Sequence, residues 1–417
     1  MKTGSPIKER RFRLAQGINR NLWYLLSGQF ISQIGDKFYA LALAYWVMES
    51  TKSAAAMGTV MLFSMLPSVI TGLFLGGFID RHNRKTILIT ADIVRGFAIM
   101  LVIAVFYFKA LTLTVIILAQ VILSISGAFF NPAVLALIPQ IVNKEQLTKA
   151  NALSQLVSGT AMIIGPVIGG LAVAYTGYWF VFVFNAISFF ISATFNLLLK
   201  VQDLWRNDDN PKGKLGVIEG YNYIFQKRNL IVLIAVIAIV HFFVGAFEVA
   251  IPTLAVCLQG NGAQNLGYLE TSFGLGAVGA GILLSTIKLS NKEEKTIFLS
   301  IRLIGIFYFI LGVVNRFGII MVWPYTIGFL LLGGVIILAS TCYRVIIQQS
   351  VENDMTGRIF GIVTSIGNGS IPIAAFIFGI LTDILKFNMI AILSGAMLLL
   401  LSTPLYRAYS RKTLNDA

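Results

Sequence analysis

Charged residues are scarce in this sequence. Asp, Glu, Lys and Arg make up 12% of the 417 residues, against about a quarter in an ordinary soluble domain. Apolar residues make up 57%, and the mean hydropathy is +0.82. This composition excludes an ordinary soluble globular protein and predicts a membrane protein with several spans.

Cysteine and histidine are also rare, with two of each. Cys257 and Cys342 fall near opposite membrane faces of the predicted spans, so we expect packing residues and no disulfide bridge. The sequence has no zinc-binding Cys/His spacing, no phosphate-binding P-loop and no hydrolase nucleophile motif. The glycines of 274–281 lie inside a predicted span, where packing explains them. The sequence therefore predicts no cofactor, no metal site and no enzymatic activity.

Apolar blocks of about 20 residues or more recur along the whole chain, and each is long enough to cross a bilayer as a helix. They predict an all-α membrane protein with twelve transmembrane helices. The blocks are 22–48, 55–79, 86–108, 112–142, 153–175, 178–199, 230–258, 266–287, 296–314, 318–347, 360–382 and 388–406.

The basic residues are distributed unevenly. Predicted cytoplasmic segments hold 24 of the 32 Lys and Arg residues, whereas the predicted outer loops hold 4, namely Lys52, Lys109, Arg316 and Lys386. We interpret the net charge of +14 as the positive-inside rule, with both termini cytoplasmic, and not as a nucleic-acid-binding surface. The basic first twenty residues lack a cleavage site and are expected to be a retained cytoplasmic tail.

One long polar interruption, 200–229, divides the spans into six and six. Its last part, 216–229, has helical spacing and is expected along the inner membrane surface. Asp36 and Glu248 end similar stretches 212 residues apart, which indicates two related halves, as in transporters with a substrate site between them. The predicted organisation is a basic tail (1–20), a six-helix bundle (21–200), a linker (201–229), a second six-helix bundle (230–406) and a C-terminal tail (407–417).

The stretch "GGFIDRHNRK", 76–85, joins the second and third spans. It resembles the loop G-x-x-x-D-[RK]-x-G-[RK]-[RK] of the major facilitator superfamily. The matching residues are Gly76, Asp80, Arg81, Arg84 and Lys85. Asn83 replaces the loop glycine, and we expect it in the left-handed backbone conformation. The resemblance implies the major facilitator fold, with two pseudo-symmetric six-helix bundles and a gating loop that clips helices 2 and 11. The alternative is that these basic residues are ordinary positive-inside residues.

Two further stretches resemble parts of the same superfamily. "GPVIGG", with Gly165, Pro166, Gly169 and Gly170, resembles the G-P-x-x-G-G motif of its exporters, which are usually proton antiporters. The alternative is simple helix packing, since Gly and Pro are common in membrane helices. The segments 125–153 and 356–362 resemble the branch that contains macrolide efflux proteins and the enterobactin exporter.

Polar residues inside the spans are the candidate functional groups, because an ionisable residue at the centre of a membrane helix costs about 2.5–3.5 kcal/mol on insertion scales. Gln29, Ser32, Gln33 and Asp36 form one stripe on the first span and are expected to face a cavity. The stripe predicts a proton or substrate site. The alternative is a structural network in which Asp36 pairs with Lys37, Arg95 or Arg302.

The seventh span carries His241 and Glu248 on one face, seven residues apart. Glu248 is the counterpart of Asp36 and a second candidate for proton coupling, while His241 is either part of the site or a hydrogen-bonded core residue. Glu270 is expected near the outer edge of its span, where it would be solvated. Arg344 is expected to extend toward the inner face.

The resulting hypothesis is a secondary active transporter that expels an amphipathic small molecule, such as a drug, macrolide or siderophore, in exchange for protons. By resemblance, helices 1, 4, 7 and 10 line its cavity. An uptake carrier or a lysolipid flippase or facilitator on the same fold is the main alternative. A membrane sensor and an intramembrane enzyme fit less well. The expected location is a bacterial plasma membrane, with the lipid bilayer, protons and the substrate as partners, no nucleic acid, and a monomeric state.

Overall fold

The computed structural model describes residues 19–80, 82–143, 146–201, 219, 221–286 and 293–413. Its long elements within these ranges are α-helices, and the ranges contain no β-strand, as the sequence predicts. The helices are α2 (Arg20–Thr51), α3 (Ala54–Asp80), α4 (Arg84–Tyr107), α5 (Leu113–Ile141), α6 (Leu147–Leu197), α8 (Arg228–Cys257), α9 (Gly262–Thr286), α10 (Glu293–Arg316), α11 (Trp323–Ser350) and α12 (Asn353–Thr413).

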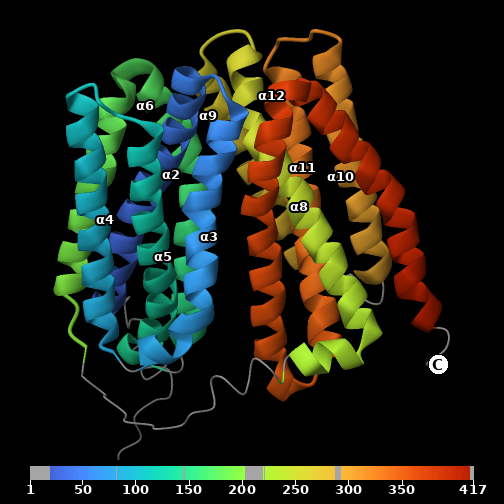
Figure 1. Ribbon diagram of the computed structural model, residues 1–417. Coiled ribbons are helices and arrows are strands. Elements are labelled where there is room, and N and C mark those ends of the chain that lie inside the picture. Colours follow the sequence, from blue (N-terminus) through green and yellow to red (C-terminus); the bar gives the residue numbers. More distant parts are fainter. Residues whose placement is uncertain are drawn as a thin grey trace, which may run out of the picture.

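Two of these helices are interrupted by one residue with non-helical backbone angles. In α6 the residue is Gly177 (φ 77°, ψ 177°), and in α12 it is Lys386 (φ 62°, ψ 166°). Figure 1 shows the chain reversing direction in α12, so that the two halves of this helix run in opposite directions. Both interruptions fall in gaps between predicted apolar blocks. These ten helices thus form twelve long helical segments, while the number of membrane crossings stays a prediction.

The apolar character of the helices fits a bilayer. Nine ranges within the described residues are long and apolar enough to cross a membrane. In lipid, backbone N–H and C=O groups must bond within their own segment, which favours helices. The first helix, α2, is not one of the nine, and it carries the polar stripe that ends at Asp36. The polar part of the linker, 202–218, lies outside the described residues, whereas 221–226 are helical.

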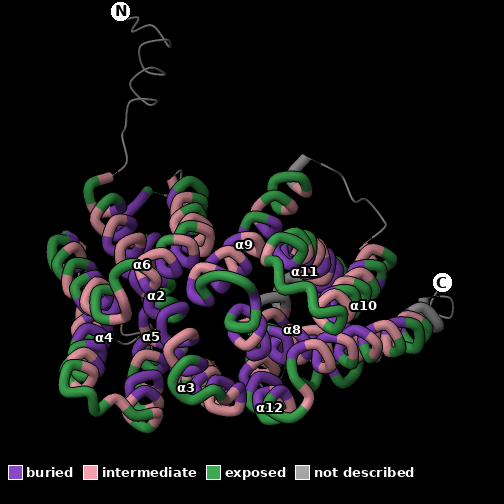
Figure 2. Tube along the Cα trace, turned by 90° about the horizontal axis from the view of Figure 1, so that it is seen from above, coloured by how far each residue is buried: buried purple, intermediate pink, exposed green. Residues whose placement is uncertain are grey.

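The helices form two groups that lie side by side (Figures 1 and 2). In the first group, α2 and α4 pack on α6, and α3 packs on α5; in the second, α8 and α10 pack on α12, and α9 packs on α11. The two groups meet mainly through α3 with α12 and through α6 with α9. This arrangement matches two bundles, while the exact domain boundaries stay a prediction.

The contact between the groups is close at one end of the molecule, which we call the turn end because it carries the α2–α3 turn and the α12 interruption. A Cβ atom added at Gly58 would lie 2.3 Å from the carbonyl oxygen of Ala375, and one added at Gly267 would lie 2.7 Å from that of Pro166. Toward the opposite end, where α12 ends (Figure 1), added Cβ atoms at Gly72 and Gly159 would meet nothing within 4 Å. The groups therefore pack tightly at the turn end and less tightly beyond the middle.

Within the second group, α10 and α12 cross at a pair of glycines. A Cβ atom at Gly395 would lie 2.5 Å from the Gly305 carbonyl oxygen and 2.6 Å from the Phe309 nitrogen. We expect Gly395→Ala to lower stability by about 1–3 kcal/mol through overpacking. The measurement is the melting temperature of the purified protein in detergent. Gly279→Ala is the control, because its Cβ would meet nothing within 4 Å. Equal melting temperatures for the two variants would contradict the packing argument.

Candidate functional site

A cavity of about 1030 Å³ lies between the two groups of helices. Helices α2, α5, α8 and α11 line it, as the family resemblance implies, but α3, α4, α6, α9, α10 and α12 also contribute. Its apolar wall includes Met61, Met65, Phe247, Phe273, Phe329 and Ile336. The volume is slightly above the usual range for ligand pockets, about 300–1,000 Å³, and so suits a bulky ligand.

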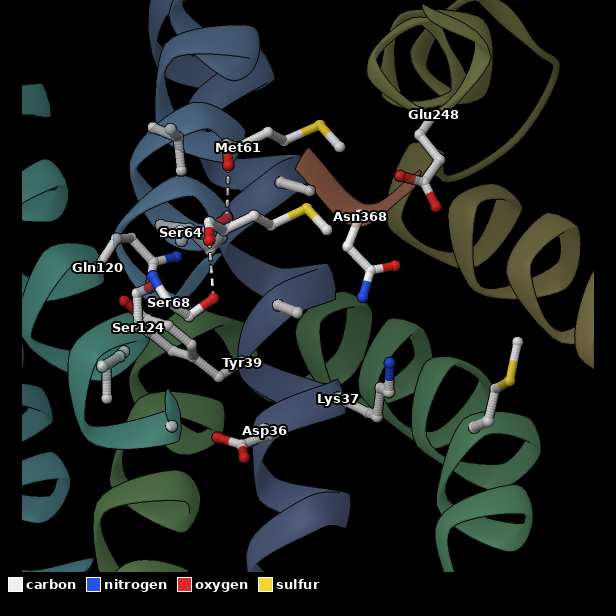
Figure 3. Close-up of a pocket in the computed structure, with 18 of the residues that line it drawn as sticks. Asp36, Lys37, Tyr39, Met61, Ser64, Ser68, Gln120, Ser124, Glu248 and Asn368 are labelled. Carbon is white, nitrogen blue, oxygen red and sulfur yellow. Dashed lines mark hydrogen bonds between the residues drawn. The ribbon is translucent and has the colours of Figure 1, made fainter. Parts of the chain in front are cut away.

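Four charged side chains line this cavity from both groups of helices: Asp36 and Lys37 of α2, Glu248 of α8 and Glu270 of α9. Lys37 and Glu248 are exposed, and the two others are half-buried. Figure 3 shows Asp36 and Lys37 pointing to different sides of α2, with Glu248 on the other side of the cavity. Among the described residues, none of the four has a hydrogen-bond or ion-pair partner. These charges are therefore available to a ligand or to protons.

A fifth charged residue, Arg95 of α4, also lines the cavity. Its guanidinium lies 4.7 Å from the ring centroid of Phe130 and 5.6 Å from that of Phe189, within cation–π range. Its Nη1 lies 3.9 Å from Oδ1 of Asp92, an ion pair without a short hydrogen bond. Asp36 is also close enough to Arg95 for their charges to interact. Arg95 therefore stands between a cavity carboxylate and a fully buried one.

Asp92 is held in place by α6. Ser192 donates a hydrogen bond of 2.7 Å, and Asn196 one of 2.9 Å, to its Oδ2. Its Oδ1 accepts no hydrogen bond from a described residue, although the side chain is completely buried. A buried carboxylate with half of its acceptors unused depends on the nearby positive charge of Arg95.

The glycines of the GPVIGG stretch bring α6 close to two other helices. A Cβ atom at Gly165 would lie 2.3 Å from Lys37 Cβ, and one at Gly169 would lie 3.1 Å from Phe38 Cα, both on α2. Gly170 approaches the other group, with its added Cβ 2.6 Å from the Ala263 carbonyl oxygen of α9. The absence of a side chain at Gly165 leaves room for the base of Lys37. This stretch therefore packs α6 both within its own group and across the interface.

The predicted stripe on α2 is only partly a cavity stripe. Ser32, Gln33 and Asp36 line the cavity, but Gln29 does not. Gln29 is 7% exposed, and its Oε1 accepts a hydrogen bond of 3.1 Å from Ser154 of α6. The expectation that Gln29 faces the cavity is therefore wrong, because the first turn of the stripe faces α6.

Three other expectations need correction. His241 does not line the cavity; its Nδ1 lies 2.9 Å from the Ile237 carbonyl oxygen, and its ring packs near Gly367 of α12. Glu270, expected at the outer edge, lines the cavity. Arg302, considered as a partner of Asp36, lies instead beside Ser402 and Thr403 within the second group. The positions expected from the sequence are wrong for these three residues because packing sets the rotation and tilt of each helix.

The loop after α3 is described in part. Gly76 and Asp80 belong to α3, while Arg81 lies outside the described residues. Arg84 donates to the Ala136 carbonyl at 3.0 Å, and Lys85 donates to the carbonyls of Leu197 and Leu199 at 2.8 and 2.7 Å. These bonds place two basic residues on α5 and on the C-terminal end of α6, where positive charge is favourable. The gating function of the loop stays a prediction.

Asn83 does not adopt the expected left-handed conformation. Its backbone is extended (φ −63°, ψ 113°), and its side chain accepts a hydrogen bond from the Thr86 amide as the N-cap of α4. Asn is among the best N-cap residues, so capping explains its presence better than a left-handed turn does.

Sequence reasoning missed several groups that the structure brings to the site. The sequence pattern indicates Lys37 and Arg95 only as partners of Asp36, and it assigns no function to Asp92. A signal was present: Asp92 and Arg95 stand three residues apart inside an apolar block, where ionisable residues usually have a function. Their spacing predicts a pair on one helix face, but not that Arg95 reaches the cavity.

Residues 25–376 match the sequence model of the Major Facilitator Superfamily. The chain belongs to this superfamily. Macrolide efflux protein A of Streptococcus pyogenes is 24% identical over 375 residues, covering 89% of this chain and 92% of that protein. The multidrug efflux pump Tap of Mycobacterium bovis is 24% identical over 372 residues, covering 86% of each. The crystal structure of the nucleoside transporter NupG has the same fold, with a TM-score of 0.78, 11% identity, and coverage of 94% of this chain and 99% of that one.

This membership establishes several of the expectations. The protein is a multi-pass membrane transporter of a superfamily whose members are not enzymes, and its relatives include macrolide and multidrug efflux proteins.

The Asp92–Arg95 pair gives a testable prediction about stability. Asp92→Asn leaves the buried guanidinium without its nearest carboxylate and should cost about 3 kcal/mol. Asp92→Asn combined with Arg95→Met removes both charges, so its cost should be smaller than the sum of the two single variants. Melting temperatures in detergent measure the cycle. Additive losses would show that the two charges do not stabilise each other.

Proposed function

We propose that this transporter expels an amphipathic small molecule, such as a drug, macrolide or siderophore, in exchange for protons. The observation that carries the proposal is the central cavity, which combines an apolar wall with four charged side chains that have no partner among the described residues. Apolar surface suits the body of an amphipathic ligand, and the charges suit its polar groups. Ionisable groups on a transport pathway also suit proton movement.

The carboxylates of the cavity are the proposed proton carriers. Asp36 lies on α2 near Arg95, and Glu248 lies on α8 in the other group. Lys37 is the basic group whose charge acts on both Glu248 and Glu270. Binding of a cationic substrate group and binding of a proton would compete for the same carboxylates. Such competition is the simplest physical basis for antiport.

The relatives named as efflux proteins and the GPVIGG stretch support the outward direction. The cytoplasmic orientation of both termini is part of the proposal and rests on the distribution of Lys and Arg. The proposed location is a bacterial plasma membrane, and the proposed unit is a monomer. Transport in the opposite direction, or lysolipid movement along its own gradient, would use the same cavity and is distinguished by experiment.

Transport in inside-out membrane vesicles tests the direction and the driving force. With an acidic interior imposed, the vesicles should accumulate a labelled macrolide, because protons leave as substrate enters. A potential of 100 mV provides about 2.3 kcal/mol per proton, which corresponds to an almost 50-fold gradient of a neutral substrate. A protonophore should abolish the accumulation. Vesicles without the protein are the control.

The other outcomes separate the alternatives. Accumulation that needs ATP and persists with the protonophore would refute proton antiport. Substrate movement that only follows its own gradient would favour a facilitator. Accumulation in right-side-out vesicles with an acidic exterior would favour uptake. The same vesicles with labelled siderophore and lysolipid extend the comparison to the other proposed substrates.

Asp36→Asn tests the proposed coupling. The amide cannot carry the exchanged proton, so accumulation of substrate against a gradient should fall to the level of vesicles without the protein. Exchange of substrate down its own gradient should remain. Glu49→Gln is the matched control, because Glu49 bonds Tyr178 and does not line the cavity. Loss of substrate binding together with transport would place Asp36 in the substrate site instead.

A further inference from the structure

The N-terminal end of α3 has an unusual set of hydrogen-bond partners. The first amides of a helix have no acceptor within the helix and must find one elsewhere. Here the Ala56 amide donates to Ser53 Oγ at 3.2 Å, and the Met57 amide donates to the Ser53 carbonyl at 3.3 Å. The Ala54 and Ala55 amides instead donate to the carboxylate of Asp383, at 2.5 Å to Oδ1 and 3.1 Å to Oδ2.

Asp383 belongs to α12 and therefore to the other group of helices. The Ser53 hydroxyl also donates to its Oδ2, at 2.6 Å, so three donors of the first group converge on one carboxylate of the second. Hydrogen bonds to a carboxylate are about twice as strong as those between neutral groups. The positive end of the α3 dipole adds to the attraction.

Close packing surrounds these bonds. A Cβ atom at Gly379, one turn before Asp383, would lie 2.6 Å from the Ala54 carbonyl oxygen. A Cβ atom at Gly58, one turn into α3, would lie 2.3 Å from the Ala375 carbonyl oxygen. Between α3 and α12, Asp383 accepts every side-chain hydrogen bond that crosses the two groups in the described part of the chain. The glycines provide a close fit, and the carboxylate provides the polar attraction.

We propose that Asp383 is a latch that holds the turn end of the transport pathway closed by capping α3 of the opposite bundle. The inference rests on the proposed transport function, because transport by this fold requires the two bundles to rock against each other around the cavity. When the turn end opens, Ala375 and Gly379 must separate from α3, and the three bonds to Asp383 must break. Asp383 is therefore a gating residue that contacts neither the cavity nor the proposed substrate.

Cysteine labelling of the cavity tests the latch without any substrate. Ala40 lines the cavity on α2, and Ala40→Cys is the reporter. Cys257 is exposed and is replaced by Ser, whereas the buried Cys342 is kept. A membrane-impermeant maleimide is added to intact cells, whose exterior faces the turn end in the proposed orientation. The labelling rate then reports how often this end opens.

Asp383→Ala should increase the labelling rate about tenfold, because it removes the charge and the three hydrogen bonds that Asp383 accepts from the first group. Asp383→Asn keeps one acceptor and should give a smaller increase. Glu49→Gln is the matched control: it also neutralises a carboxylate on a helix that ends at the turn end, but its partner Tyr178 belongs to the same group. This variant should leave the rate unchanged.

An Asp383→Ala rate equal to the rates of the parent protein and Glu49→Gln would overturn the latch. The same labelling in inside-out vesicles gives the second readout, and there Asp383→Ala should slow the reaction, because the cavity spends less time open to that side. An increase from both sides would indicate general loosening and would also overturn the proposal. The outcome is independent of the transport assays, since a failure of proton-coupled efflux would leave these rates unaffected.

Discussion

The structure depends on one constraint, which is that charged side chains cannot face hydrocarbon at low cost. Asp36, Lys37, Glu248 and Glu270 all lie within long apolar helices, and all four turn toward the space between the two groups. Arg95 satisfies the same constraint differently, with its guanidinium between two aromatic rings and beside the buried Asp92. The cavity is thus where these four charged side chains can remain hydrated.

Contact between the two groups relies on features that can separate and reform. Glycines such as Gly58 and Gly267 let backbones touch without interlocking side chains. Such surfaces fit closely, yet little rearrangement is needed to part them. The polar contribution at α3 is concentrated on a single carboxylate, Asp383, rather than spread over a network. A closed end of this kind is compatible with a protein that alternates between conformations.

The GPVIGG stretch links the packing of the bundles to the cavity. Gly165 leaves space for the base of Lys37, Pro166 lines the cavity, and Gly170 approaches α9 of the other group. A change in the angle between α6 and α9 would therefore also affect the surroundings of a cavity charge. This coupling is a physical reason for small residues at these positions, and it needs no assumption about the direction of transport.

The sequence by itself determined the class of protein: its hydropathy predicted long helices, and the motifs at 76–85 and 165–170 predicted the superfamily. It also identified Asp36, Gln33 and Glu248, which line the cavity, because polar residues stand out in apolar blocks. Only the tertiary structure decided which polar residues meet. In the folded chain Gln29 accepts a hydrogen bond from Ser154, His241 does not line the cavity, and Glu270 does. Sequence spacing fixes the helix face a residue occupies, but the neighbour of that face depends on helix rotation and tilt. The contact between Asp383 and Ser53 shows the same limit, because the two residues are 330 positions apart and only packing of the bundles joins them.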